Sequence, residues 1–144
     1  MHRPTDLLWI RWLEVVLLLV MAYSLVLVVD GGLALRLFDA LGFGPDAADD
    51  AFRDYLRLPF AVLGAVMVGW MALLFAVVHG PLRRREPWAW PAVVLSLAAW
   101  FVLDTGMSMV LGFPTHALFN LVFAVALAVP LIGLRRSRST PVAS

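Results

Sequence analysis

The 144-residue chain contains no cysteine, no lysine and no glutamine, and its only asparagine is Asn120. The absence of cysteine excludes disulfides, thiolate metal sites and thiol nucleophiles. All eleven basic residues are arginines. Because side-chain amides are so rare in this chain, an asparagine inside an apolar stretch is a position that needs a specific explanation.

Apolar side chains, by contrast, are abundant: 62% of the residues are hydrophobic, and the mean hydropathy is +0.91. A soluble domain of this length cannot bury so much apolar surface in one core, so a water-soluble fold is excluded. We expect the lipid bilayer as the main partner and no nucleic acid among the partners. No internal repeat is visible, which argues against a transporter built from two inverted copies.

Four segments are long enough to cross a membrane, since a helix needs about 20 apolar residues to span a hydrocarbon core of ~30 Å. We predict an all-α integral membrane protein, a single domain over residues 1–136 with four transmembrane helices in an antiparallel bundle. Residues 137–144 are expected to be a disordered tail. The N-terminal stretch has no clear signal-peptide cleavage site, so we expect it to remain as the first span. The spans are predicted at about residues 7–29, 58–79, 88–111 and 115–134.

The arginines predict how these spans are oriented. Eight of the eleven arginines fall on one side of a four-span arrangement, whereas residues 30–57 on the other side hold six aspartates and three arginines. Basic loops face the cytoplasm, so both termini are expected inside a bacterial cytoplasmic (inner) membrane. Tryptophans gather at membrane boundaries, and four of them occur at the predicted cytoplasmic boundary: Trp9, Trp12, Trp88 and Trp90.

The external segment, residues 30–57, is too long for a simple turn. Positions 34, 37, 38 and 41 form one apolar face, which predicts a short helix lying in the membrane interface. A second helix is expected over residues 47–57, capped by Asp46, with Asp49 and Arg53 paired. The segment fits either a surface cap over the helix ends or a lid over an outward-opening pocket.

Small residues recur at helical spacing along the second span. A face of small residues lets a neighbouring backbone approach closely, which is how helices associate in lipid. We interpret this stripe as internal packing, with a homodimer interface as the alternative. Its members are Ala61, Ala65, Gly69, Ala72 and Ala76.

The third span contains a single charged residue, Asp104, which is the centre of the strongest site signal. A tight turn at Gly112 joins the third and fourth spans, so Asp104 is predicted to lie opposite Asn120, and Ser108 opposite His116. A helix rises 1.5 Å per residue, which places Asp104 ~9 Å below the external end of its helix.

A carboxylate in hydrocarbon costs ~3 kcal/mol or more, so Asp104 should face the bundle interior and find donors. The candidate donors are the amide of Asn120 and the hydroxyls of Ser108, Thr105 and Tyr23. Two interpretations stay open: a structural hydrogen bond that clasps the hairpin, and a ligand or proton site, since loss of water favours the neutral acid. One histidine and one aspartate are too few for a metal site, and no catalytic nucleophile arrangement follows from this spacing.

A second membrane carboxylate, Glu14, lies one turn from Arg11 in the first span. We predict a structural ion pair between them, because arginine can reach water from this position. In having a carboxylate near the start of its first helix, the chain resembles the proton-coupled small multidrug transporters. The surrounding residues, Leu13-Glu14-Val15-Val16, show no further motif of that family.

The second span has a Gly/Ala-rich segment, residues 64–70, and the third has a polar end, residues 104–108. In these features the chain resembles the small four-helix bacterial membrane proteins of the DoxX-like group, some of which are associated with quinone-linked redox chemistry. We expect a non-enzymatic accessory subunit or small binding module, with a polar pocket in the outer half of the bundle and no cofactor. The alternatives are a proton-coupled transporter using Asp104 and a quinone-linked redox subunit. A larger membrane complex is a further candidate partner.

Overall fold

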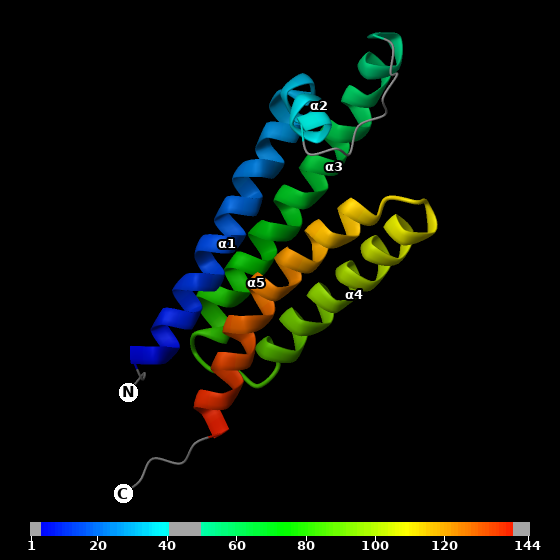
Figure 1. Cartoon of the computed structure of the whole chain (residues 1–144). Helices are drawn as coiled ribbons and strands as arrows, with labels where there is room; N and C mark the ends of the chain where they lie inside the picture. Colours follow the sequence, from blue (N-terminus) through cyan, green and yellow to red (C-terminus); the bar gives the residue numbers. More distant parts are fainter. Residues whose placement is uncertain (1–3, 41–49, 140–144) are drawn as a thin grey trace, which may run out of the picture. The chain divides into compact units, whose positions relative to one another are not determined.

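The computed structural model describes residues 4–40 and 50–139, which are helical apart from short turns. Four of the helices are long and apolar enough to cross a membrane. This confirms the prediction of an all-helical, multi-pass membrane protein. Along the described chain (Figure 1) the elements are α1 (Pro4–Val29), α2 (Gly31–Ala40), α3 (Asp50–Val77), the π-helical turn η1 (Val78–Leu82), α4 (Ala89–Val110) and α5 (Pro114–Ser139).

The observed helices extend beyond two of the predicted spans. In α3 the helix already begins at Asp50 and continues through Pro59, so the expected helix before this proline and the second span are one element. In α5 the helix runs to Ser139, so residues 137–139 of the expected disordered tail are helical. Position 41, Asp46 and Asp49 lie outside the described residues, as do the side chains at 34, 37 and 38.

The chain divides into two compact units. One comprises Met1–Leu17 and Leu74–Ser144, and therefore holds the beginning of α1, the end of α3, η1, α4 and α5. The other comprises Leu18–Leu73, with the rest of α1, α2 and most of α3.

In the unit Leu18–Leu73, α1 and α3 come very close at Gly64. A Cβ atom at this glycine would lie 2.6 Å from the carbonyl oxygen of Ser24 and 2.8 Å from the Cβ atom of Leu27. Ser24 is fully buried, and its hydroxyl donates a hydrogen bond to the carbonyl oxygen of Val20 at 2.7 Å. The close approach of the two helices therefore depends on the missing side chain at Gly64.

The stripe of small residues on α3 is not this packing face. Its residues are exposed apart from Ala61, which is half-buried, and a Cβ atom at Gly69 would meet nothing within 4 Å. The interpretation of the stripe as internal packing is therefore wrong. With 3.6 residues per turn, adjacent positions point about 100° apart, so Gly64 faces α1 while its neighbour Ala65 points elsewhere.

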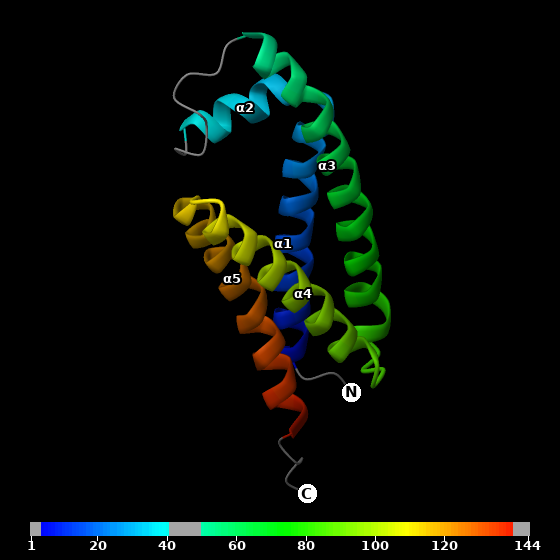
Figure 2. The same ribbon diagram turned by 90° about the vertical axis from the view of Figure 1, so that its right-hand side faces the viewer.

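Two aspartates fix the part of the chain between α1 and α3 that the structure describes. The backbone N–H of Leu33 donates to Oδ1 of Asp30 at 2.9 Å, so Asp30 caps the start of α2. From the other end of α2, Oδ2 of Asp39 accepts from Nη1 of Arg53 on α3 at 2.8 Å. As Figure 2 shows, α2 turns sharply away from the direction of α1.

In the other unit, α4 and α5 form an antiparallel hairpin, and Figures 1 and 2 both show them side by side. Gly112 has a φ of 80°, and its N–H donates to the carbonyl of Met109. The N–H of Phe113 donates to the carbonyl of Ser108 at 2.8 Å. These are the two bonds of a Schellman cap, which confirms the predicted tight turn at Gly112. Pro114 then begins α5, where a missing N–H leaves no helical bond unmade.

The start of α1 packs against this hairpin. A Cβ atom at Gly133 on α5 would lie 2.5 Å from Cε2 of the Trp9 indole, so the ring lies directly on the backbone of α5. The buried carboxylate of Asp6 is paired with Arg85, which follows η1 and has a φ of 62°. The other oxygen of Asp6, Oδ1, has no hydrogen-bond partner among the described residues. These contacts fix the first turns of α1 to the segment that leads into α4.

Candidate functional site

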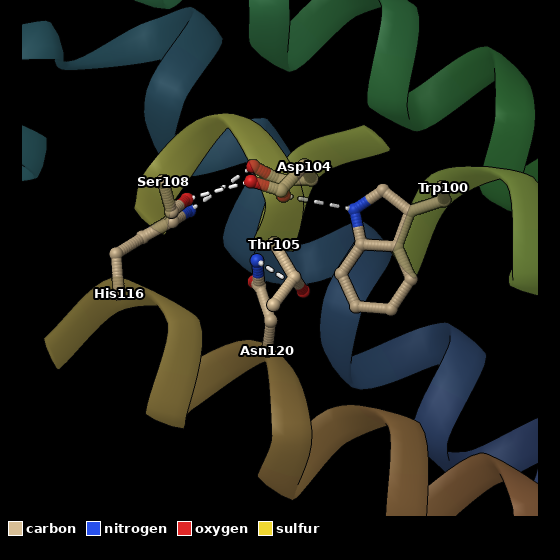
Figure 3. Close-up of polar contacts among 6 residues, drawn as sticks. All are labelled: Trp100, Asp104, Thr105, Ser108, His116 and Asn120. Atoms are coloured by element: carbon tan, nitrogen blue, oxygen red, sulfur yellow. Dashed lines mark hydrogen bonds and ion pairs between the residues drawn. The ribbon is translucent and has the colours of Figure 1, made fainter. Parts of the chain in front are cut away.

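Polar side chains gather on the facing sides of α4 and α5 toward the Gly112 turn (Figure 3). On α4 the successive spacings are four, one and three residues, and on α5 the spacing is four, so neighbours three or four residues apart share a side of each helix. The two sets face each other across the hairpin. The members are Trp100, Asp104, Thr105 and Ser108 from α4, and His116 and Asn120 from α5.

The carboxylate of Asp104 has a partner on each oxygen. Its Oδ2 accepts a hydrogen bond from Nε1 of Trp100, one turn earlier on α4, at 3.1 Å. Its Oδ1 lies 3.4 Å from Nε2 of His116 on α5. The side chains of Asp104 and His116 are 37% and 27% exposed, so the pair is only partly shielded by the chain. The contact between the two helices is an ion pair when the imidazole carries the proton, and a neutral hydrogen bond when the carboxyl group carries it.

The structure corrects the predicted partners within the hairpin. The buried amide of Asn120 donates from Nδ2 to Oγ1 of Thr105 at 3.4 Å, instead of pairing with Asp104. The hydroxyl of Ser108 donates to the backbone carbonyl of Asp104 at 2.7 Å. Reflection through the turn places residues at equal depth, but it ignores the rotation of each side chain about its helix axis. The hairpin residues are therefore the predicted ones, but Asp104 pairs with His116 and Asn120 with Thr105.

Two further residues, Trp100 and Tyr23, differ from the prediction in other ways. Sequence reasoning missed Trp100, although its signal is present, since an indole N–H four residues before a membrane aspartate lies on the same helix face. Tyr23 belongs to the unit Leu18–Leu73, which does not contain the hairpin. Its proximity to Asp104 remains a prediction.

A second carboxylate–imidazole pair lies between α1 and η1. Nδ1 of His79 is 2.8 Å from Oε1 of Glu14, and the imidazole stacks on Phe75 with 5.7 Å between ring centroids. This pair replaces the predicted ion pair between Glu14 and Arg11, whose side chain is exposed. In η1 the helix widens around Pro81, which has no N–H to give to the carbonyl four residues earlier. The widened turn carries His79.

Both histidines in the described part of the chain thus face a carboxylate that the sequence places within an apolar span. Imidazole is the side chain best suited to gain and lose a proton near neutral pH, and a carboxylate beside it accepts or stabilises that proton. The Asp104–His116 pair joins two adjacent helices, and the N–H of Trp100, on the same helix as Asp104, orients the carboxylate. The arrangement suits binding of a proton or of a small ligand that donates hydrogen bonds.

The hairpin also has a groove of about 770 Å³, and its place differs from the predicted polar pocket. The groove begins near Trp100 and extends away from the Gly112 turn to Arg135 and Arg136. Its walls are mainly apolar side chains of α4 and α5, so it is not the polar outer-half pocket that the sequence suggested.

The likeness to the DoxX-like group rests on the Gly/Ala-rich segment and the polar helix end, and it remains a prediction from the sequence. The hairpin site is defined by its geometry: one carboxylate–imidazole pair, one buried amide and one indole donor. A second carboxylate–imidazole pair lies between α1 and η1. Compared with known proteins, the chain matches no family model, no curated protein and no solved structure.

Proposed function

We propose that this chain is a non-enzymatic binding module of the bacterial cytoplasmic membrane, with a site for an exchangeable proton between α4 and α5. The observation that carries the proposal is the pairing of Asp104 with His116, two titratable groups on facing apolar helices. Ionisable residues inside membrane helices are costly, and they mark proton relays, ion pathways and ligand sites. Here either member of the pair can hold the proton.

A purely structural clasp explains the pair less well. The hairpin is already joined by the buried amide of Asn120, which donates to Thr105 without any titratable group. Asp104 and His116 keep partly exposed side chains, which is what proton exchange with the surroundings requires. A structural contact gains nothing from that exposure.

We further propose that both termini lie in the cytoplasm, as the arginine distribution indicates. With this orientation the Gly112 turn faces outward. Six residues separate Asp104 from Val110 at the end of α4, which places the carboxylate ~9 Å below the outer end of the helix. The proton site would then lie in the outer half of the membrane.

Infrared difference spectroscopy between acidic and neutral pH tests the proton site directly, using the purified full chain in lipid. We expect a carboxylic-acid band that changes with pH and has a component that is lost in Asp104→Asn. The matched control is Asp39→Asn, which removes a carboxylate from α2 that is paired with Arg53 outside the hairpin. If the band is absent in the wild type, or persists unchanged in Asp104→Asn, the proposal is overturned.

A second candidate function, proton-coupled transport, is favoured by the Glu14–His79 pair. A transporter must take up and release its proton on both sides of the membrane. In the proposed orientation, Glu14 and His79 lie toward the cytoplasmic side, and Asp104 and His116 toward the outside. The chain would then hold one proton-binding pair in each half.

Proton flux into liposomes containing a pH-sensitive dye distinguishes the two functions. For a transporter, an imposed pH gradient drives flux that is lost in both Glu14→Gln and Asp104→Asn. For a binding module, the wild type shows no more flux than empty liposomes, while the pH-dependent infrared band remains.

Association with other chains is also proposed. The exposed stripe on α3 offers a face of small side chains to a second copy or to a helix of a larger membrane complex. Gentle detergent extraction from the native membrane, followed by identification of co-purifying chains, tests this association. Recovery of the chain as a monomer without partners would count against it. The stripe consists of Ala61, Ala65, Gly69, Ala72 and Ala76.

A further inference from the structure

The groove between α4 and α5 has the size of a ligand site and walls suited to hydrocarbon. Its volume is about 770 Å³, within the range of about 300–1,000 Å³ typical of small-molecule sites. Along α4 it extends from Trp90 to Phe101, which is about 16 Å at 1.5 Å per residue. Side chains such as Leu97, Ala128 and Ile132 line it, and none of the described lining residues is acidic. The groove is thus long, narrow and apolar.

One end of the groove is strongly basic. Arg135 and Arg136 both line it there. The guanidinium of Arg135 lies over the Trp90 ring, 5.1 Å from the ring centroid, a cation–π contact. The ring itself is fixed because its Nε1 donates to the carbonyl oxygen of Leu131 at 3.0 Å. An arginine is therefore held at the mouth of the groove, and guanidinium groups match the geometry of phosphate oxygens.

We propose that this groove binds one acyl chain of an anionic phospholipid, with the lipid phosphate at Arg135 and Arg136. An acyl chain gains little by leaving bulk lipid for an apolar groove, because the two environments are equally apolar. The preference for a particular lipid must therefore come from the headgroup. Two arginines at this end of the groove select a negative headgroup over a zwitterionic one. The lipid comes from the leaflet that meets the carboxyl end of α5.

The far end of the groove provides an independent readout. Trp100 lines the groove there, and its indole N–H donates to Asp104. The end of a bound acyl chain contacts this indole, so a lipid with brominated acyl chains quenches its fluorescence. The lipid-site proposal does not depend on the proton-site proposal, since none of the proposed lipid contacts involves a titrating group.

The lipid preference is measured by native mass spectrometry of the full chain, released from detergent with equal amounts of phosphatidylglycerol and phosphatidylcholine. We expect phosphatidylglycerol to be retained preferentially. The double variant Arg135→Gln/Arg136→Gln should lower this preference about 10- to 30-fold, since each arginine that contacts the anionic headgroup contributes a roughly fivefold attraction. Arg135→Lys/Arg136→Lys keeps the charge and should retain most of the preference.

Two further variants separate a groove lipid from general attraction to a basic surface. Arg83→Gln/Arg84→Gln removes the same charge from residues that do not line the groove, and it should leave the preference unchanged. Ala128→Phe fills the groove and keeps both arginines, and it should abolish retention. Equal retention of both lipids by the wild type, an equal loss in the Arg83/Arg84 variant, or full retention in Ala128→Phe would overturn the proposal.

Brominated lipids provide a measurement that does not depend on the folding of any variant. In the wild type, brominated phosphatidylglycerol should quench tryptophan fluorescence more strongly than brominated phosphatidylcholine at equal mole fraction. Equal quenching by the two lipids would overturn the proposal.

Discussion

Replacing Gly64 by alanine tests the packing of α1 against α3 with a single methyl group. The new Cβ atom would lie 2.6 Å from the carbonyl oxygen of Ser24, 2.8 Å from Cβ of Leu27 and 2.9 Å from Cγ2 of Val28. Two of these atoms are backbone or directly attached to it, so a rotamer change cannot remove the clash. The helices must instead separate locally, by up to about 0.8 Å, to restore ordinary contact distances near 3.4 Å.

The cost of this separation can be estimated from the contacts that it loosens. A gap of 0.5–1 Å forfeits about a quarter to a half of each atom-pair attraction of 0.1–0.2 kcal/mol. A fully buried leucine makes about 40–60 such contacts, and Leu27 is 1% exposed. Loosening the contacts of this one side chain by a quarter therefore costs about 2 kcal/mol, within the range of about 1–3 kcal/mol for overpacked cores.

The matched control is Gly69→Ala on the same helix, where the new Cβ atom meets nothing within 4 Å. Alanine is favoured over glycine in helices by up to about 1 kcal/mol, so this variant should be as stable as the wild type or more so. Reversible unfolding in mixed micelles, followed by circular dichroism, measures both free energies of unfolding. If Gly64→Ala is as stable as Gly69→Ala, the close packing of α1 on α3 at this position is refuted.

Other substitutions test the hairpin and its contact with α1. Gly133→Ala drives a Cβ atom into the Trp9 indole and should lower the free energy of unfolding by about 1–3 kcal/mol. In Gly106→Ala on α4 the new Cβ atom meets nothing within 4 Å, so this variant should keep the stability of the wild type. Equal thermal stability of the two variants would contradict the packing of Trp9 on Gly133. Asp104→Leu removes the acceptor of His116 and should destabilise the hairpin by about 1 kcal/mol, whereas Asp104→Asn keeps a carbonyl acceptor and should cost less. Chemical unfolding of the two variants measures this difference, and an equal loss would argue that the acceptor has no role in stability.

Hydropathy predicted the four long apolar helices because it depends on each residue separately and on the thickness of the bilayer. The turn at Gly112 was predictable for a similar reason, since a glycine between two apolar runs and before a proline is a local signal. The helix before Pro59 was predicted, but its continuity with the second span was not, because a polar helix that precedes a proline looks like a separate element. Nothing in the hydropathy pattern joins it to the span.

Partner choice was harder to predict because it depends on how each helix is rotated about its axis. Gly64 and Ala65 are adjacent in sequence, yet only Gly64 faces α1. In the same way, Asp104 meets His116 instead of Asn120, since equal depth does not give equal direction. A contact such as Glu14 with His79 joins residues 65 positions apart, which no local pattern specifies.

The length of α3 has a consequence for the level at which α2 lies. The helical segment Ala51–Leu82, a candidate membrane span, is 32 residues long, about 48 Å at 1.5 Å per residue, whereas the hydrocarbon layer is ~30 Å thick. The excess must extend past the lipid tails or be taken up by tilt. Arg57 is the last charged residue of α3. Arg53 lies one turn, about 6 Å, nearer the start of the helix, and its ion pair with Asp39 holds α2 there. The charged first turns of α3 therefore serve as the anchor of α2, and the apolar remainder of the helix supplies the length that a bilayer needs.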